Sequence, residues 1–469
     1  MTPGTPLWQW SATDLHRAYC EGQTTPVAAL RACMDRIAEV NPKINAFVAQ
    51  RAAVWQDAEA SRERYREGKP LSVLDGLPLS IKDNLCTKDM PTTWGSPALR
   101  DHQSGADEWP VARARAAGAL IVGKTNVPEF TLEGYTDNPL FGPTRNPWNL
   151  ALTPGGSSGG AVASVAAGCT PLAMGTDGGG SIRRPASHCG LVGFKPSIGS
   201  IARGDGLPSL LLDFEVVGPM ARSVADARLL FEALRGPVDG DRASLAATAA
   251  KPVSRALSEP LRVLYVPTLN HAPVDPEIAA QCAAAALQLA RLGHTVHTGE
   301  LPLPLDDINS AWSSVGQIGL AALFAQHPDW RQGASPKYLN MASLGSGVSA
   351  QALWALLNNV ERLRQACSRL FEEWDVIAMP SAAALPWPAA QAFPTEIAGQ
   401  AVGPRGHAVF TGWVNAAGLP AISIPVAPSA SGLPIGLQLI GAYGADDALF
   451  DLAQTIETQT PWAHRWPTL

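Results

Sequence analysis

The sequence predicts an α/β fold with helices on both faces of a β-sheet. Apolar, strand-like runs alternate with segments of helical periodicity along most of the chain, which is the pattern of such folds. The composition, 46% apolar and 16% charged over 469 residues, is typical of a globular protein with a sizeable core. This length allows about three domains or one large α/β domain.

The elements follow from local signals along the chain. The first 50 residues have helical patterns, since Ser11 with Asp14, and Thr25 with Pro26, are signals of helix starts. The strands expected after them are 77–82, 119–122, 170–177, 261–267, 375–381, 419–426 and 433–441. The helices expected after them are 109–118, 158–168, 223–234, 275–293 and 445–458. The segment around Pro237 to Pro260, rich in Ala, Ser and Pro, is expected to be a loop within one sheet rather than a domain boundary.

Composition also bears on partners and location. A net charge of −6 gives no support for nucleic-acid binding, and no run of about 18 apolar residues predicts a membrane span. The N-terminus lacks the pattern of a secretory signal. Seven scattered cysteines predict reduced thiols in a cytoplasmic protein, and nine histidines without metal-ligand spacing predict no metal site.

The stretch "GALIVGKT", Gly118 to Thr125, matches the phosphate-binding P-loop pattern. In a P-loop, however, the variable residues form a loop and a helix starts at the lysine. Here they are Ala-Leu-Ile-Val, which favour a strand, and Pro128 follows where the helix would run. A buried strand ending in a polar turn is the favoured interpretation, and a nucleotide-binding protein is kept as an alternative.

Two glycine-rich stretches carry candidate serines. "PGGSSGG" satisfies G-x-S-x-G at Ser157 and at Ser158, as in the nucleophile elbow of α/β-hydrolases, but the residues before it make a poor strand. "GTDGGGSIRRP" presents Ser181 after three glycines. That loop could bind phosphate, or Gly178, Gly179 and Gly180 could turn their N–H groups toward an oxyanion beside Ser181.

A nucleophilic serine needs a base. None of the available histidines, His188, His294, His297 and His407, has a context that singles it out. A lysine can serve when burial keeps it neutral, and Lys82 ends an apolar strand that would carry it into the core.

At this point the residues resemble the amidase signature family of hydrolases. "GGSSGGAVASVAAGCTPLAMGTDGGGSIRRPASHCGLVGFKP", Gly155 to Pro196, is similar to the family's hallmark. "LDGLPLSIKDN" resembles its lysine block, and "NAAGLPAISIPV" and "LPIGLQLIG" resemble its last strands. The resemblance covers nearly the whole chain, with a signature core at about 70–235 after N-terminal helices at about 1–65. It implies a single domain over 1–469, an α/β/α sandwich around a large mixed sheet.

The resemblance also implies roles for individual residues. Ser181 matches the nucleophile, Ser157 the bridging serine, and Lys82 the base. A cis peptide is implied between Gly156 and Ser157. Gly178, Gly179 and Gly180 match the oxyanion hole, and Asp177 and Arg183 match positions expected to support the loop. No cofactor is implied.

The substrate is less determined. Arg184, three residues after Ser181, could hold a substrate carboxylate or form a structural contact, and Trp94 and Tyr135 could line the pocket or pack in the core. The first hypothesis is a stand-alone amidase acting on a small-molecule amide, for which a homodimer is left open. The second is the amidase-like component of a glutamine-dependent tRNA amidotransferase, which works in a complex. The third is the nucleotide-binding protein.

Overall fold

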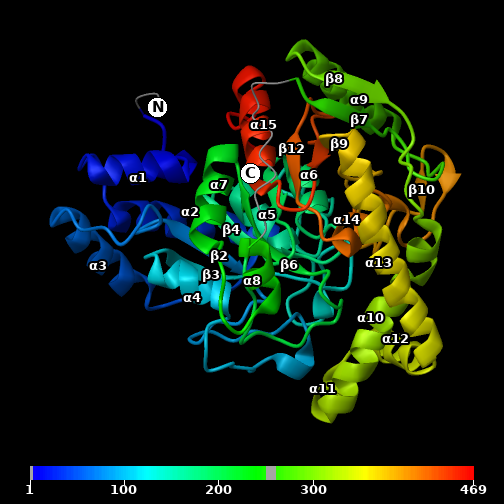
Figure 1. Ribbon diagram of the computed structural model, residues 1–469. Coiled ribbons are helices and arrows are strands. Elements are labelled where there is room, and N and C mark those ends of the chain that lie inside the picture. The colour runs from blue at the N-terminus through cyan, green and yellow to red at the C-terminus, as the bar shows by residue number, and fades with distance from the viewer. Residues whose placement is uncertain (1–3, 250–259) are drawn as a thin grey trace.

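A computed structural model, which describes residues 4–249 and 260–469, is built around one mixed sheet of eleven strands (Figure 1). The strand order is β1-β3-β2-β4-β6-β5-β12-β13-β9-β7-β8. Neighbouring strands are parallel in the groups β3-β2-β4 and β9-β7-β8, and antiparallel elsewhere in this sheet. This is the α/β architecture with a large mixed sheet that the sequence and the resemblance predicted.

The strands of this sheet are β1 (Phe47–Gln50), β2 (Pro78–Lys82), β3 (Leu120–Thr125), β4 (Leu172–Asp177), β5 (Val192–Lys195), β6 (Val216–Ala221), β7 (Arg262–Tyr265), β8 (Thr295–Thr298), β9 (Val376–Pro380), β12 (Ala421–Pro425) and β13 (Gly436–Ile440). A separate two-stranded ribbon is formed by β10 (Glu396–Ile397) and β11 (Gln400–Ala401).

The α-helices are α1 (Ala12–Cys20), α2 (Pro26–Ile44), α3 (Val54–Arg66), α4 (Trp109–Ala116), α5 (Gly159–Ala166), α6 (Arg183–Cys189), α7 (Val224–Leu234), α8 (Arg242–Ala249), α9 (Pro276–Arg291), α10 (Asp306–Gln326), α11 (Pro328–Gly333), α12 (Pro336–Ser346), α13 (Ala350–Glu373), α14 (Gly412–Ala417) and α15 (Asp446–Gln459). Short 3₁₀ turns occur at η1 (Leu7–Gln9), η2 (Pro97–Leu99), η3 (Glu129–Thr131) and η4 (Gly406–Ala408).

All seven strands expected from the sequence are present, and four strands of the large sheet were missed. The expectation that the first 50 residues are helical is wrong at β1, which pairs antiparallel with β3. Strand β6 carries Pro219, a residue that argues against a strand because it cannot donate to a ladder. The loop expected around Pro237 to Pro260 contains helix α8, and residues 250–259 of it lie outside the described residues.

Two pairs of helices pack on the middle of the sheet (Figure 1). Helices α5 and α6 contact each other, and α6 also contacts β5 and β12. Helices α7 and α15 likewise contact each other, with α7 against β5 and α15 against β12. α5 consists entirely of Gly, Ala, Val and Ser and is wholly buried, because small side chains allow it to lie close to its neighbours. The layered core thereby fixes the segments on either side of α5 and α6.

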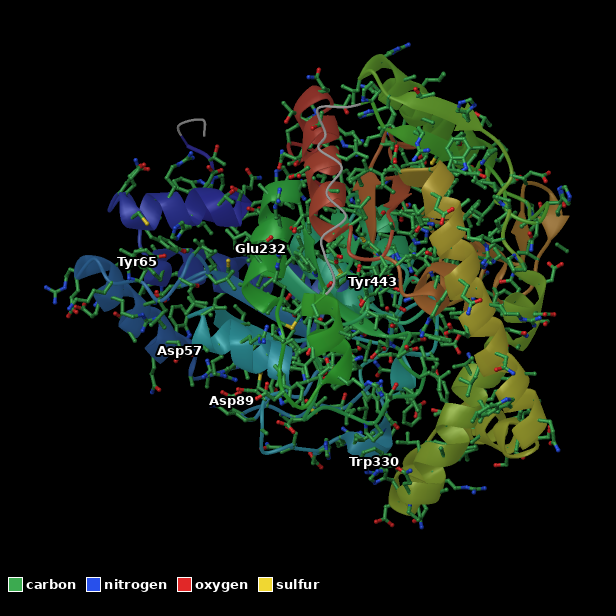
Figure 2. The ribbon with its side chains drawn as sticks, in the orientation of Figure 1. Asp57, Tyr65, Asp89, Glu232, Trp330 and Tyr443 are labelled. Carbon is green, nitrogen blue, oxygen red and sulfur yellow. The ribbon has the colours of Figure 1, made fainter. Side chains whose placement is uncertain are left out.

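Two further layers lie at opposite ends of the sheet (Figure 1). Near the N-terminus, Arg51 after β1 forms ion pairs with Asp57 of α3 and with Asp89 in the loop after β2; both acids are labelled in Figure 2. At the other end, α10 packs on α11, α12 and α13, and α13 packs on α14. Helix α10 carries Trp312, which reaches the glycine loop after β4.

Candidate active site

The candidate residues come from segments that meet at one edge of the sheet. Strands β2 and β4 are parallel neighbours, so their carboxyl ends lie side by side. Lys82 is the last residue of β2, and Thr176 and Asp177 end β4. The polar side chains that follow these strands are therefore held by the buried core rather than by mobile loops.

Lys82 is completely buried at this edge. Its Nζ lies 2.8 Å from Ser157 Oγ, 2.8 Å from Thr176 Oγ1 and 3.1 Å from the Thr176 carbonyl oxygen. Burial lowers the pKa of Lys82 from 10.5 to about 7, against the opposing charges of Glu215 and Asp177. A neutral amine has two N–H donors and one lone pair, so it can donate to both Thr176 oxygens and accept the Ser157 proton. Lys82 is thus placed to act as a base.

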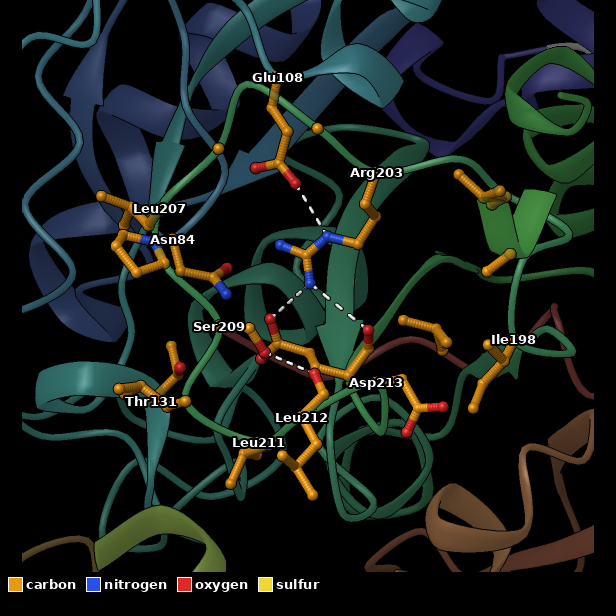
Figure 3. A pocket seen from close by; sticks show the side chains of 18 of the residues that line it. Asn84, Glu108, Thr131, Ile198, Arg203, Leu207, Ser209, Leu211, Leu212 and Asp213 are labelled. Carbon is orange, nitrogen blue, oxygen red and sulfur yellow. Dashed lines mark hydrogen bonds and ion pairs between the residues drawn. The ribbon is translucent and has the colours of Figure 1, made fainter. Parts of the chain in front are cut away.

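A chain of charges continues from Lys82 through Thr176. Thr176 Oγ1 accepts a hydrogen bond from Asn84 Nδ2 at 3.0 Å and donates to Glu215 Oε2 at 3.3 Å. Arg203 donates to Glu215 at 2.7 Å and to Glu108 at 2.9 Å (Figure 3). These residues, with Asn84, line a cavity of about 340 Å³. The carboxylate of Glu215 is therefore one hydroxyl group away from the lysine.

Ser157 and Ser181 approach each other from the two glycine-rich stretches. The Gly156–Ser157 peptide is cis, as the family resemblance implies. The Ser181 carbonyl oxygen accepts a hydrogen bond from the Ser158 N–H at 3.2 Å. The Ser181 hydroxyl forms no hydrogen bond with a described residue, and Ser181 lines a second cavity of about 270 Å³. This hydroxyl is therefore available to a molecule bound there.

The glycine loop before Ser181 is held in one shape by contacts that exclude side chains. Gly180 has a φ of +112°, and a Cβ there would lie 2.2 Å from Thr411 Oγ1. Its N–H donates to Asp177 Oδ1 at 2.6 Å. The N–H groups of Gly178, Gly179 and Ser181 have no hydrogen-bond acceptor among the described residues. These three donors remain for an oxyanion, whereas the Gly180 N–H is used by Asp177.

Asp177 and Arg183 are fully buried and paired beneath this loop. Arg183 donates to both carboxylate oxygens at 3.0 Å, and its guanidinium also donates to Asn415 and Gln438. Although burial opposes ionisation, the charge of Arg183 and its hydrogen bonds hold the pKa of Asp177 below its ordinary value. Asp177 also accepts from the Ile182 N–H at 3.1 Å, so this pair orients the backbone on both sides of Ser181.

The structure separates the three residues expected to line the substrate pocket. Arg184 lines the cavity of Ser181. Trp94 lines the neighbouring cavity instead, and its Nε1 donates to Thr131 Oγ1 at 3.1 Å. Tyr135 lines neither cavity, and its backbone packs against Gly156. A role in binding substrate stays a prediction for all three.

The stretch that matches a P-loop is strand β3, as its apolar residues predicted. Lys124 is fully buried within it, 3.1 Å from Asp83 and 2.8 Å from both the Leu85 carbonyl oxygen and Thr92 Oγ1. A lysine committed to protein acceptors inside a sheet cannot reach a bound phosphate. The structure therefore contradicts the nucleotide-binding alternative at this stretch.

Sequence reasoning missed several residues around the serines and the lysine, namely Asn84, Thr176, Arg203, Glu215, Arg405 and His407. Asn84 and Thr176 stand within the matched motifs "SIKDN" and "GTDGGGS", so the motifs held a signal. The others come from distant segments. His407 shares the cavity of Ser181, but burial and nearby cationic side chains hold its pKa well below the ordinary value, and its Nε2 contacts Arg184.

Comparison with known proteins agrees with this geometry. A family model described as Amidase matches residues 28–450. The chain is 34% identical over 467 residues to an acylamidase of Rhodococcus erythropolis, with 97% of each chain covered. The chain belongs to the amidase signature family.

A bacterial aryl acylamidase of this amidase signature family has the same fold, with a TM-score of 0.87, 28% identity and 98% of each chain covered. Another relative, the amidase-like component of the glutamyl-tRNA(Gln) amidotransferase of Symbiobacterium thermophilum, is 33% identical, with 98% of each chain covered. The chain is an amide-hydrolysing enzyme. In the part of this amidase that the structure describes, no helix is long and apolar enough to cross a bilayer, and no cluster of three metal-ligating side chains occurs.

Proposed function

We propose that this amidase hydrolyses small-molecule amides through an acyl-enzyme on Ser181, with Ser157 as the bridging residue and Lys82 as the base. The observation that carries this proposal is the 2.8 Å approach of Lys82 Nζ to Ser157 Oγ in a fully buried site, where the pKa of the lysine is lowered to about 7. At neutral pH a large fraction of such lysines is unprotonated and able to accept a proton.

The reaction begins when Lys82 takes the proton of Ser157, which takes the proton of Ser181. The Ser181 oxygen attacks the amide carbon, and the N–H groups of Gly178, Gly179 and Ser181 stabilise the oxyanion. The proton returns from Lys82 through Ser157 to the leaving nitrogen as the carbon–nitrogen bond breaks, releasing ammonia or an amine. Water then attacks the ester, its proton enters the same relay, and Ser181 is regenerated as the acid leaves.

Three variants and one probe test these roles. Ser181→Ala is expected to abolish hydrolysis of an aryl amide with unchanged circular dichroism and thermal stability. Lys82→Ala is expected to lower kcat by at least about 10²-fold, the usual contribution of a general base. Ser310→Ala, a change at an exposed serine of α10, serves as the control. A fluorophosphonate should label Ser181 in the wild type, as mass spectrometry of peptides would show. Full activity of Ser181→Ala would refute the proposal.

The similarity to tRNA amidotransferase components supports a second candidate, in which the chain releases ammonia from glutamine inside a complex. The two candidates differ in assembly. The purified stand-alone enzyme is expected to hydrolyse simple amides without another protein. Copurification with a different protein chain, on which all activity depends, would favour the amidotransferase.

We further infer one domain over 1–469, since β1 and β13 lie in the same sheet. A homodimer is an open prediction that light scattering would test. A cytoplasmic location is proposed from the seven cysteines, all free thiols, because structural disulfides are rare in reducing compartments. Fractionation of the source cells would test it.

A further inference from the structure

The cavity in front of Ser181 has an unusual balance of charge. Its ionisable lining residues are Glu133, Arg184, Arg405 and His407. Glu133 is paired with Lys337, so its charge is already balanced by a residue outside the lining. The low pKa of His407 leaves its imidazole neutral near pH 7. The two arginines therefore determine the charge that a bound molecule meets.

Arg184 is a buried cation without an acidic partner. Only 6% of its surface is exposed, and its described contacts are the Gly180 carbonyl oxygen at 3.3 Å and His407 Nε2 at 2.7 Å. Burial lowers the pKa of Arg184 to about 10, which leaves it charged at neutral pH. Neighbouring Arg183, by contrast, is fully compensated by Asp177. A buried charge that lacks a counter-ion is costly unless a ligand supplies one.

Arg405 stands at the mouth of the same cavity. The residue is exposed, and its guanidinium carbon lies 4.9 Å from the centre of the Trp312 ring on α10. It forms no ion pair with a described residue. Stacking on an aromatic face orients a guanidinium while leaving its N–H groups free for a planar anion. The cavity thus has one cation at its wall and another at its entrance.

Arg184 lies one helical turn from the serine. Its backbone N–H donates to the Gly180 carbonyl oxygen at 3.0 Å, so the chain from Gly180 to Arg184 makes the first turn into α6. Residues three apart on such a turn have Cβ atoms about 5–6 Å apart. A molecule that places its amide carbon at Ser181 can therefore reach the guanidinium with a short chain.

We propose that Arg184 and Arg405 form a carboxylate subsite, so that the substrates are amides whose acyl part ends in a carboxylate a few bonds from the scissile carbonyl. The proposal rests on the proposed function of Ser181 as nucleophile. Guanidinium groups bind carboxylates through paired, charge-assisted hydrogen bonds, which no neutral amide can replace. The subsite would hold the acid end and direct the carbonyl toward Ser181.

The first test compares matched substrates. Succinamate, which carries a carboxylate, is compared with neutral butyramide, and longer homologous pairs follow. The wild type is expected to prefer the acid by at least about 30-fold in kcat/KM, as the loss of a buried charge contact typically costs. Arg405→Gln and Arg184→Gln should each lower this preference. The exposed Arg362→Gln on α13 is the matched control and should retain it.

A binding measurement separates recognition from folding and catalysis. Succinate, the expected product, should inhibit the wild type competitively more strongly than butyrate, and Arg405→Gln should weaken succinate alone. Arg405 is exposed, so this variant is expected to fold even if Arg184→Gln does not.

Equal kcat/KM for succinamate and butyramide, or unchanged succinate inhibition in Arg405→Gln, would overturn the subsite. Failure of the proposed function looks different, because the wild type would then hydrolyse neither amide and Ser181 would not react with the fluorophosphonate.

Discussion

Replacing Glu215 by glutamine tests how the protein sets the protonation of its base. Glu215 Oε2 accepts from Thr176 Oγ1, which in turn lies 2.8 Å from Lys82 Nζ. The negative carboxylate raises the pKa of Lys82 against the larger lowering caused by burial. Glutamine keeps the size and an acceptor oxygen but removes the charge. The pKa of Lys82 should therefore fall below its wild-type value of about 7.

The size of the shift follows from the two contacts in series. They place the carboxylate oxygen no more than about 6 Å from Lys82 Nζ. At an effective dielectric constant of about 20, two unit charges at this separation interact by about 3 kcal/mol, or about two pKa units. The Glu215 side chain is 17% exposed, so solvent screens part of this interaction. We expect a shift of about one to two pH units.

The assay is the pH dependence of kcat/KM for a neutral amide. The base must be unprotonated, so activity rises with pH through the pKa of Lys82 in the free enzyme. In Glu215→Gln this acidic limb should move to lower pH. Glu232→Gln, at a partly exposed acid on α7, controls for the loss of one negative charge elsewhere. The position of the limb is the readout, since the height of the plateau also responds to altered packing.

Two outcomes would refute this reasoning. If the limb of Glu215→Gln coincides with that of Glu232→Gln, Glu215 does not act on the titrating group. If the limb moves to higher pH, the group is an acid required in its charged form or the sign of the coupling is wrong.

Three further predictions concern the same region. Gly180→Ala should lower kcat by at least about 10²-fold, because a Cβ there meets Thr411 Oγ1 at 2.2 Å and displaces the oxyanion donors; steady-state kinetics with a fluorophosphonate titration would check it. Arg183→Leu should destabilise the fold by about 3–5 kcal/mol in urea unfolding because it leaves Asp177 buried without its partner, and a cost below about 1 kcal/mol would contradict this. For Lys82, the folded pKa of about 7 lies below the unfolded value of 10.5, so the unfolded chain binds more protons between these values and stability rises with pH there. Lys82→Met should reduce that slope of unfolding free energy by up to about 1.4 kcal/mol per pH unit, and an unchanged slope would show that Lys82 does not titrate in this range.

The sequence determined the secondary structure best where the pattern was long and apolar. Strands β2, β3, β4, β9, β12 and β13 are fully buried along their length and therefore appear as continuous apolar runs. Short β1, Pro-containing β6 and the largely exposed β8 lack that pattern. Their pairing is supplied by neighbours far along the chain, which local periodicity does not report.

For the site, the motifs specified residue types and their spacing. They marked Ser157, Ser181 and Lys82 as candidates, because a glycine-rich turn and a lysine after an apolar strand are local features of the chain. They also left Arg184 open between a structural contact and a substrate contact. No spacing rule could choose, since the answer depends on which acids surround the guanidinium.

The tertiary structure decided the electrostatics. The parallel pairing of β2 with β4 places Thr176 against Lys82, and the packing of the segment after β5 brings Glu215 and Arg203 behind it. Folding likewise gives Asp177 to Arg183 and leaves Arg184 facing a cavity without an acid among its described neighbours. Charge interactions depend on distance and burial, which the order of residues along a chain does not contain. The sequence alone therefore indicates the chemistry of this amidase, whereas its protonation state and the proposed charge of its substrate depend on contacts between distant segments.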